Sequence, residues 1–179
     1  MSVELKSVAY HEAGHAAVAL RLGIGIGRKG VSIVPKDNLL GWAHICKGFV
    51  GNPEYEATDS MRLKVENRVL ALLAGMHAES NQSGEGCEED IRRAWGLLEY
   101  FCGSDEEVQA YLDWLNIRAK QLVASEVCQV KIEALAQALL EKKKLSAAEV
   151  KAIARAAVDH WIADNQSKTT SPRSIVQAK

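Results

Sequence analysis

The chain has 179 residues, of which 47% are hydrophobic and 25% charged, the balance of a soluble globular protein with one sizeable core. Its net charge of −1 argues against nucleic acid or a membrane surface as partner, because both need a concentrated basic surface. No apolar run approaches the roughly 20 residues that span a bilayer, and no secretory signal is visible. Four cysteines without a Cys-x-x-Cys pair indicate reduced thiols and therefore a cytoplasmic protein.

Hydrophobic periodicity predicts a mainly α-helical chain with one small β-hairpin. The first helix is expected over residues 3–22, and the glycines from Gly23 to Gly30 indicate a flexible connector. This glycine run is not interpreted as a phosphate loop, because it follows a helix and no Gly-Lys-Ser/Thr occurs in the chain. Two β-rich runs at 31–35 and 40–46, separated by polar residues 36–38, are typical of a hairpin.

The rest of the chain is predicted to be helical. Three helices are expected over residues 59–79, 88–103 and 104–142. The third is too long for one ordinary helix, so a break is predicted near residues 124–125. The polar, glycine-containing residues 80–86 indicate a loop.

A capping box, Ser146-Ala147-Ala148-Glu149, predicts the start of a final helix that ends near Ile162. Residues 163–179 are polar and contain serine, threonine and proline, so a disordered tail is expected there. The sequence thus predicts one domain over residues 1–162.

The residues that point to chemistry lie inside the first helix, in His11-Glu12-Ala13-Gly14-His15. Residues four apart share one helix face, so both imidazoles can reach one metal ion. Glu12 is rotated by about 100° from His11, which suits a general base acting on a metal-bound water. This pattern arises by chance in about one chain of this length in a couple of hundred. A glycine inside a helix costs about 1 kcal/mol relative to alanine, so Gly14 favours a metal site over a purely structural helix.

Two histidines leave a catalytic zinc ion one protein ligand short. Candidates for the third ligand are His44, Glu66, His77, Glu79, Glu88, Glu89, Asp90 and His160. His44 is expected at the surface of a strand, and His77 is expected to be a capping or core residue. Spacing alone does not choose among the others.

Several segments together resemble the peptidase domain of FtsH-type ATP-dependent zinc metalloproteases. These segments are Ala9-Tyr10-His11-Glu12-Ala13-Gly14-His15-Ala16, residues 31–35 with Leu40-Gly41-Trp42, Leu73-Ala74-Gly75-Met76-His77-Ala78-Glu79, Gly86-Cys87-Glu88-Glu89-Asp90-Ile91 and residues 139–150. The combination is far more specific than the histidine motif alone.

The resemblance implies a helical zinc metallopeptidase domain that binds one zinc ion per chain through His11, His15 and Asp90, with Glu12 as the base. Glu79 would orient a ligand histidine through its second ring nitrogen. An extended peptide substrate would pair with a strand edge formed by Leu40, Gly41, Trp42 and Ala43.

The chain also departs from that family's pattern. No membrane anchor or ATPase module is recognised, Met76-His77 stands where the family prefers Arg-Ala, and Cys87 replaces a small apolar residue. A thiol so near a zinc site could bind metal or inhibit on oxidation.

The expected function is a zinc-dependent, ATP-independent endopeptidase that acts on peptides or unfolded segments, with zinc-bound water activated by Glu12. The alternative is a catalytically weak metal-binding module that associates with or regulates a full-length FtsH-type protease ring. Because the family's peptidase domains form hexameric rings, the expected partners besides substrate are further copies of the chain or an AAA+ protease.

Overall fold

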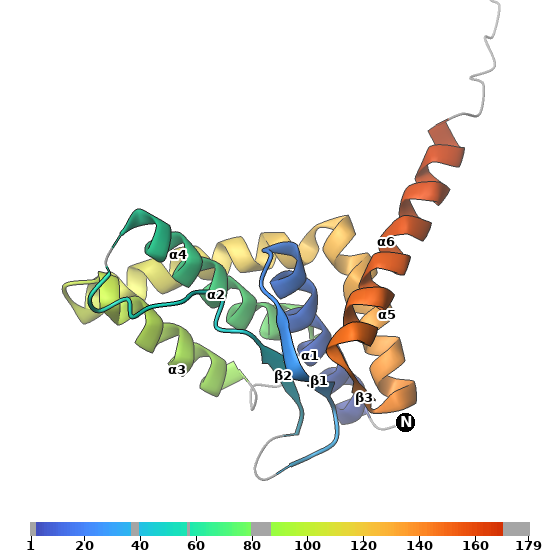
Figure 1. Ribbon diagram of the computed structural model, residues 1–179, viewed down its shortest axis with the longest axis horizontal. Helices are drawn as coiled ribbons and strands as arrows, with labels where there is room; N and C mark the ends of the chain where they lie inside the picture. The colour runs from blue at the N-terminus through green and yellow to red at the C-terminus, as the bar shows by residue number, and fades with distance from the viewer. Residues whose placement is uncertain (1–2, 37–39, 57, 80–86, 170–179) are drawn as a thin grey trace, which may run out of the picture.

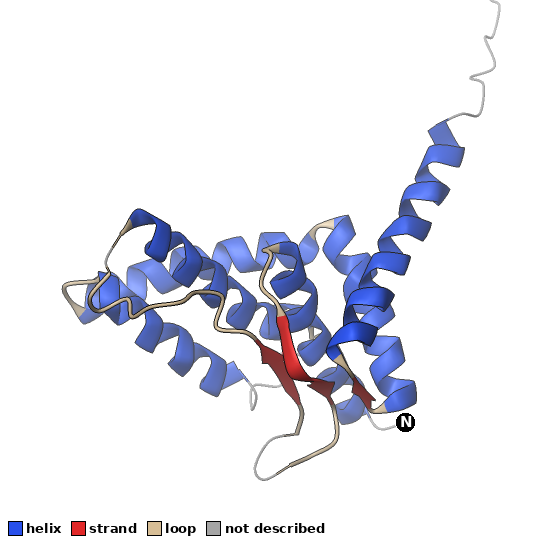
Figure 2. Cartoon of the chain, viewed as in Figure 1, coloured by secondary structure: helices blue, strands red, loops and turns tan. Residues whose placement is uncertain are grey.

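The computed structural model describes residues 3–36, 40–56, 58–79 and 87–169. Within these ranges the elements are α1 (Val3–Arg21), β1 (Ile26–Ser32), β2 (Trp42–Ile45), α2 (Asp59–Ala78), α3 (Cys87–Leu98), the 3₁₀ turn η1 (Glu99–Phe101), α4 (Asp105–Ala124), α5 (Glu126–Lys142), β3 (Lys144–Leu145) and α6 (Ala147–Thr169). The fold is mainly α-helical with one small antiparallel sheet, as the periodicity predicts (Figure 2). None of the described helices combines the length and hydropathy that a bilayer span requires. All four cysteines are free thiols.

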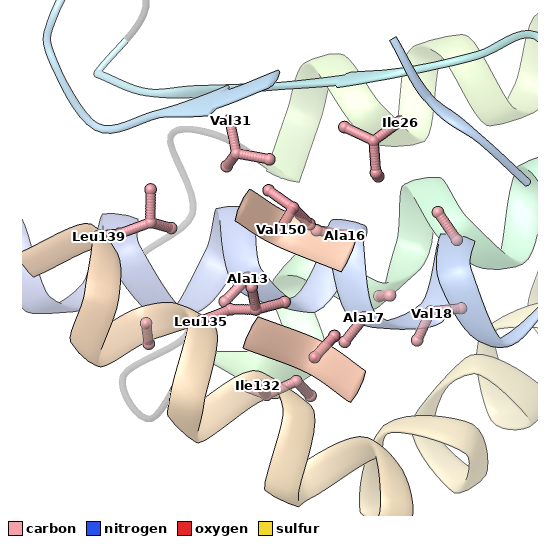
Figure 3. Packing of buried hydrophobic residues seen from close by; sticks show 14 of the residues in the cluster. Ala13, Ala16, Ala17, Val18, Ile26, Val31, Ile132, Leu135, Leu139 and Val150 are labelled. Carbon is pink, nitrogen blue, oxygen red and sulfur yellow. The ribbon is translucent and has the colours of Figure 1, made fainter. Parts of the chain in front are cut away.

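Helix α1 lies at the centre of the molecule, between α2 and α5, with the sheet beside it (Figure 1). Residues 11–19 are buried without interruption, so no face of this stretch meets solvent. Ala13 and Ala17 lie among Ile132 and Leu135 of α5 (Figure 3). Because alanine side chains are short, neighbouring elements approach the backbone of α1 closely.

A second core cluster joins α2, α3 and α4. Its fully buried side chains include Val65, Val69, Leu73, Leu98 and Leu115. Helix α2 takes part in both regions, because Ala71 and Ala74 belong to the cluster around α1. One face of α2 therefore packs against α1 and another against α3 and α4.

The sheet has the order β2-β1-β3, with both pairs antiparallel. The hairpin between β1 and β2 is confirmed, but β1 begins at Ile26, so the prediction of a flexible glycine connector is wrong for residues 26–30. Glycine is required at these positions because neighbouring atoms leave no room for a side chain. A Cβ on Gly30, whose φ is +75°, would lie 1.9 Å from the carbonyl oxygen of Leu145 in β3. A Cβ on Gly27 would lie 2.5 Å from Nδ1 of His44.

The predicted break in the long helical segment is confirmed, since α4 ends at Ala124 and α5 begins at Glu126. The capping box before α6 is also confirmed. The hydroxyl of Ser146 accepts from the backbone N–H of Glu149 at 3.3 Å, and the carboxylate of Glu149 accepts from the backbone N–H of Ser146 at 2.9 Å. By contrast, α3 ends at Leu98, earlier than predicted, and η1 follows it.

Helix α6 continues to Thr169 and projects from the rest of the molecule (Figure 1). The expectation of disorder is therefore wrong for residues 163–169, which contain neither glycine nor proline to stop the helix. The expected turn at residues 37–38, the loop at 80–86 and the tail at 170–179 lie outside the described residues.

Candidate metal centre

Two glycines let α1 and α2 cross at backbone contact. A Cβ on Gly14 would lie 2.5 Å from Cβ of Ala78 and 2.8 Å from the carbonyl oxygen of Ala74. A Cβ on Gly75 would lie 2.6 Å from Nε2 of His15 and 2.7 Å from Nε2 of His11. The backbone of α2 therefore lies directly against the two imidazoles and closes one side of the site.

Three side chains meet in a tight triangle at this crossing. The Nε2 atoms of His11 and His15 lie 2.9 Å apart, and Oδ2 of Asp90 lies 3.1 Å from the first and 3.0 Å from the second. All three residues are buried, with exposed fractions of 5%, 5% and 8%. The start of α3 thus folds back onto α1 and brings Asp90 to the histidine pair, which lies far from it in sequence.

The chemistry of this donor set fits a metal ion. Nδ1 of His15 lies 2.8 Å from the carbonyl oxygen of Ala71, which can only accept, so this nitrogen carries the hydrogen and Nε2 presents a lone pair. The carboxylate of Asp90 presents lone pairs to the same point. Acceptor atoms so close together repel each other unless a proton or a metal cation lies between them, and imidazole nitrogen and carboxylate oxygen are common zinc ligands.

The electrostatics also favour a positive charge here. Burial disfavours the imidazolium of His11, but contacts with Asp90, Cys87 and Glu79 outweigh it and raise the pKa of His11 to about 12. Burial likewise opposes the charged form of Asp90, yet His15 and His11 hold its pKa well below the usual range. A buried position that holds a proton this strongly is also suited to a divalent cation.

Glu12 lies beside the triangle and is 6% exposed. Burial raises the pKa of Glu12 to about 7, although His15 and His11 oppose that shift. A carboxylate whose pKa lies near neutrality can accept a proton and release it again at pH 7. The position of Glu12 next to both histidines therefore suits a proton-transferring group.

A cavity of about 410 Å³ opens onto the triangle and Glu12. The expected substrate segment lines it, through Leu40, Gly41, Trp42 and Ala43. β2 is an outer strand of the described sheet, so it has an edge without a partner strand. A Cβ on Gly41 would lie 2.9 Å from Oε1 of Glu12, so this segment runs directly past the carboxylate.

Glu79 lies beside Nδ1 of His11. Its Oε1 atom is 3.1 Å from Nδ1 of His11, without the alignment of a hydrogen bond, and its Oε2 atom is buried without a partner among the described residues. Cys87 joins these two residues in a second group of side chains close enough to share a cation. The thiol of Cys87 thus lies close to both His11 and Glu79.

The other candidates for a third ligand lie elsewhere. His77 bonds to Asn116 at 2.7 Å, which fits the expected structural role, and Glu66 bonds to the hydroxyl of Tyr111. The remaining candidates are exposed or have other partners, as shown by Nδ1 of His44 with the backbone of Lys29, exposed Glu88, Glu89 with Arg92 and Arg93, and His160 with Asp164. Among the candidates, Asp90 is the residue that contacts both histidines.

Two residues of the site were missed in the sequence. Gly75 could have been found as a glycine inside a long apolar helix, which signals close approach of a neighbour. Arg68 lines the cavity from α2. Its signal is a charge in the same helical register as buried Val65 and Leu72, where an apolar residue is expected.

Comparison with known proteins gives this geometry a context. The profile of peptidase family M41 matches residues 2–101. The chain is 25% identical over 173 residues to "ATP-dependent zinc metalloprotease FtsH 2" of Thermoanaerobacter sp. (strain X514), an alignment that covers 84% of this chain and 32% of the relative. It is 28% identical to FtsH 1 of Sorangium cellulosum (strain So ce56), covering 89% of this chain and 31% of the relative.

A third relative, the FtsH protease of Mesomycoplasma conjunctivae, is 32% identical over 96 residues, covering 51% of this chain and 12% of the relative. The chain therefore spans a third or less of these relatives. The profile match covers more than half of the chain and includes His11, Glu12, His15 and Asp90. The chain belongs to peptidase family M41, the family of the FtsH zinc metalloprotease domain.

Proposed function

We propose that this domain is a zinc-dependent endopeptidase that cleaves peptides and unfolded segments without nucleotide. His11, His15 and Asp90 would hold one zinc ion, and the triangle of their Nε2, Nε2 and Oδ2 atoms at about 3 Å spacing is the observation that carries the proposal. When bound there, zinc supplies a Lewis acid that polarises the scissile carbonyl.

Glu12 acts as the general base in this proposal. Its carboxylate accepts a proton from the attacking water and delivers it to the nitrogen of the departing amine. The raised pKa of Glu12, about 7, supports both halves of this transfer at neutral pH. Glu79, at 3.1 Å from Nδ1 of His11, is the positioning residue that fixes the ring's orientation.

The substrate is an extended chain that adds to the free edge of β2. Leu40, Gly41, Trp42 and Ala43 line the cavity that contains Glu12, so a peptide paired with this edge passes the base. Pairing through backbone hydrogen bonds needs an unfolded segment, so we expect the enzyme to prefer flexible chains. An already unfolded segment needs no unfolding before it pairs, so its cleavage by this domain would need no nucleotide.

The test compares zinc content and cleavage of unstructured peptides in the wild type, Glu12→Gln and Asp90→Ala. The wild type should hold about one zinc per chain, and Asp90→Ala should bind it at least about 10-fold more weakly. Glu12→Gln should keep the zinc and lose at least about 100-fold in kcat. His160→Ala, on an exposed part of α6, is the matched control and should change neither quantity.

Two outcomes separate the alternatives. Equal peptide cleavage by wild type and Glu12→Gln would disprove the proposed role of Glu12. A zinc-loaded protein that cleaves no peptide in a broad library would instead favour a metal-binding module that associates with a full-length protease ring. Native mass measurement of the protein with such a ring would then test that module directly.

A further inference from the structure

We propose that Arg68 forms a carboxylate-binding subsite in the cavity beside the metal centre, so that this peptidase selects substrates by a negative charge. The carboxylate is either an acidic side chain near the scissile bond or the C-terminus of a short peptide. The inference rests on the proposed function for its substrate, but binding to the subsite can be measured without cleavage.

The first observation is one guanidinium nitrogen of Arg68 that has no hydrogen-bond partner among the described residues. Arg68 lines the same cavity as Glu12 and the β2 edge. Its Nη1 atom is buried and has no hydrogen-bond partner among the described residues. Burial lowers the pKa of Arg68, which shows that desolvation opposes the charge. A buried charged donor without a partner is costly, so its retention in a cavity wall points to a ligand.

The second observation concerns the other charges that line the cavity. Arg93 pairs with Glu89 at 2.7 Å, and Glu89 is also held by Arg92 on its other oxygen. Asp90, whose negative charge acts on Arg68, already lies between both imidazoles. Of the two arginines in the described cavity lining, Arg68 is thus the one for which no ion pair occurs among the described residues.

The chemistry of the guanidinium and the shape of the cavity then indicate a carboxylate as the ligand. A guanidinium presents a planar fork of donors that matches the two oxygens of a carboxylate. The cavity of about 410 Å³ is continuous from Arg68 to Gly41 and Trp42, so a peptide on the β2 edge can place a side chain or terminus at Arg68. A carboxylate there would bind the part of the guanidinium that lines the cavity and neutralise the partly buried charge.

The test measures binding of short labelled peptides to zinc-loaded Glu12→Gln protein by fluorescence anisotropy. The peptides contain alanine, serine and leucine, carry one central Glu or Gln, and end in a free or amidated C-terminus. At least one carboxylate should improve affinity by about 10-fold or more over its amide counterpart. The Glu-to-Gln pair reports a side-chain source, and the free-to-amide pair reports a terminal one.

The same peptides are then bound to Arg68→Gln, Arg68→Lys and Arg118→Gln in that background. Arg68→Gln should reduce the preference for the carboxylate to about 2-fold or less, and Arg68→Lys should restore part of it as a point charge. Arg118 is exposed on α4 beside Trp114, so its variant is the control and should keep the full preference.

Three results would overturn the inference. The first is equal binding of all four peptides by the protein in which Arg68 is unchanged. The second is an equal loss of affinity for acid and amide peptides in Arg68→Gln. The third is a preference for the carboxylate that remains complete in Arg68→Gln. The comparison of peptides on the protein with Arg68 intact does not depend on any Arg68 variant folding. Absence of cleavage by the wild type would count against the proposed function alone, because the binding preference is measured without turnover.

Discussion

The two core regions of this domain differ in the size of the side chains that their central helices contribute. In the region around α1, that helix itself contributes mostly small side chains, among them Ala9, Ala13, Ala16, Ala17 and Ala19, and its Gly14 lies against the backbone of α2. Between α2, α3 and α4 the core consists mainly of valine, leucine and methionine side chains, whose volume fills the space between the helices. This difference in side-chain size determines where the polar site can form. Two helices in backbone contact leave the imidazoles little freedom to move, whereas large aliphatic side chains between the helices would occupy that space.

This contrast predicts opposite sensitivities to mutation. Close-packed interiors tolerate neither added nor removed atoms well, but the two costs differ in size and place. In the cluster between α2, α3 and α4, called here the leucine-rich region, the damaging change should be the removal of side-chain volume. Around α1 the damaging change should be the addition of a single methyl group.

The largest expected effect on stability is in the leucine-rich region. Leu115 of α4 is fully buried at 0% exposure, so Leu115→Ala should lower the free energy of unfolding by about 2–5 kcal/mol through lost burial and a cavity. Ile117→Ala is the control, because Ile117 lies on the same helix and is 58% exposed. Urea denaturation of both variants checks this, and equal losses would contradict the role assigned to volume.

The next effect comes from one added methyl group at the α1–α2 crossing. A Cβ at Gly14 would meet the backbone oxygen of Ala74 at 2.8 Å, which cannot move without shifting α2, so Gly14→Ala should cost about 1–3 kcal/mol. Gly96→Ala on α3 is the matched control, because the closest atom to its Cβ is 3.9 Å away. That variant should gain up to about 1 kcal/mol from helix propensity. Opposite signs in thermal or urea unfolding are the expected result.

The sequence predicted the parts of this architecture that depend on local pattern. The helices, the break at Ser125 and the capping box at Ser146 follow from periodicity and from hydrogen bonds between near neighbours. Strand β1 was misplaced because its glycines are required by His44 and Leu145, which lie far along the chain. The two-residue strand β3 is too short to leave a pattern.

The site shows the same division. The helical spacing of His11 and His15 places them on one face, and the structure brings them together. Asp90 was implied by the family resemblance and not by spacing, because the meeting of α1 with α3 is a tertiary event. Arg68 was missed because a single charge on a helix normally reports a solvent-exposed face, and only the cavity shows otherwise.

A smaller effect is expected on metal binding when a methyl group is added at Gly75, which lies against the two imidazoles. Gly75→Ala would place a Cβ 2.6 Å from His15 and 2.7 Å from His11, so the rings must rotate and zinc affinity should fall by about 10-fold. Competition with a chromogenic chelator measures this. Because Gly14 contacts Ala78 and Ala74 and not the rings, Gly14→Ala should weaken zinc binding less than Gly75→Ala. The reverse order would mean that helix distance, and not contact with the rings, controls the metal centre.

The smallest effect should fall equally on both regions, because it acts on the helix they share. Thr58 caps α2, and its hydroxyl accepts from the backbone N–H of Met61 at 3.2 Å. Thr58→Ala should lower the free energy of unfolding by about 1 kcal/mol, whereas Thr58→Ser keeps the cap and should change it little. Zinc affinity should stay unchanged in both variants, since the cap lies at the end of α2 far along the helix from Gly75. A loss of zinc affinity in Thr58→Ala would show that the first turn of α2 and the imidazole contact move together, which would remove the separation between the two regions.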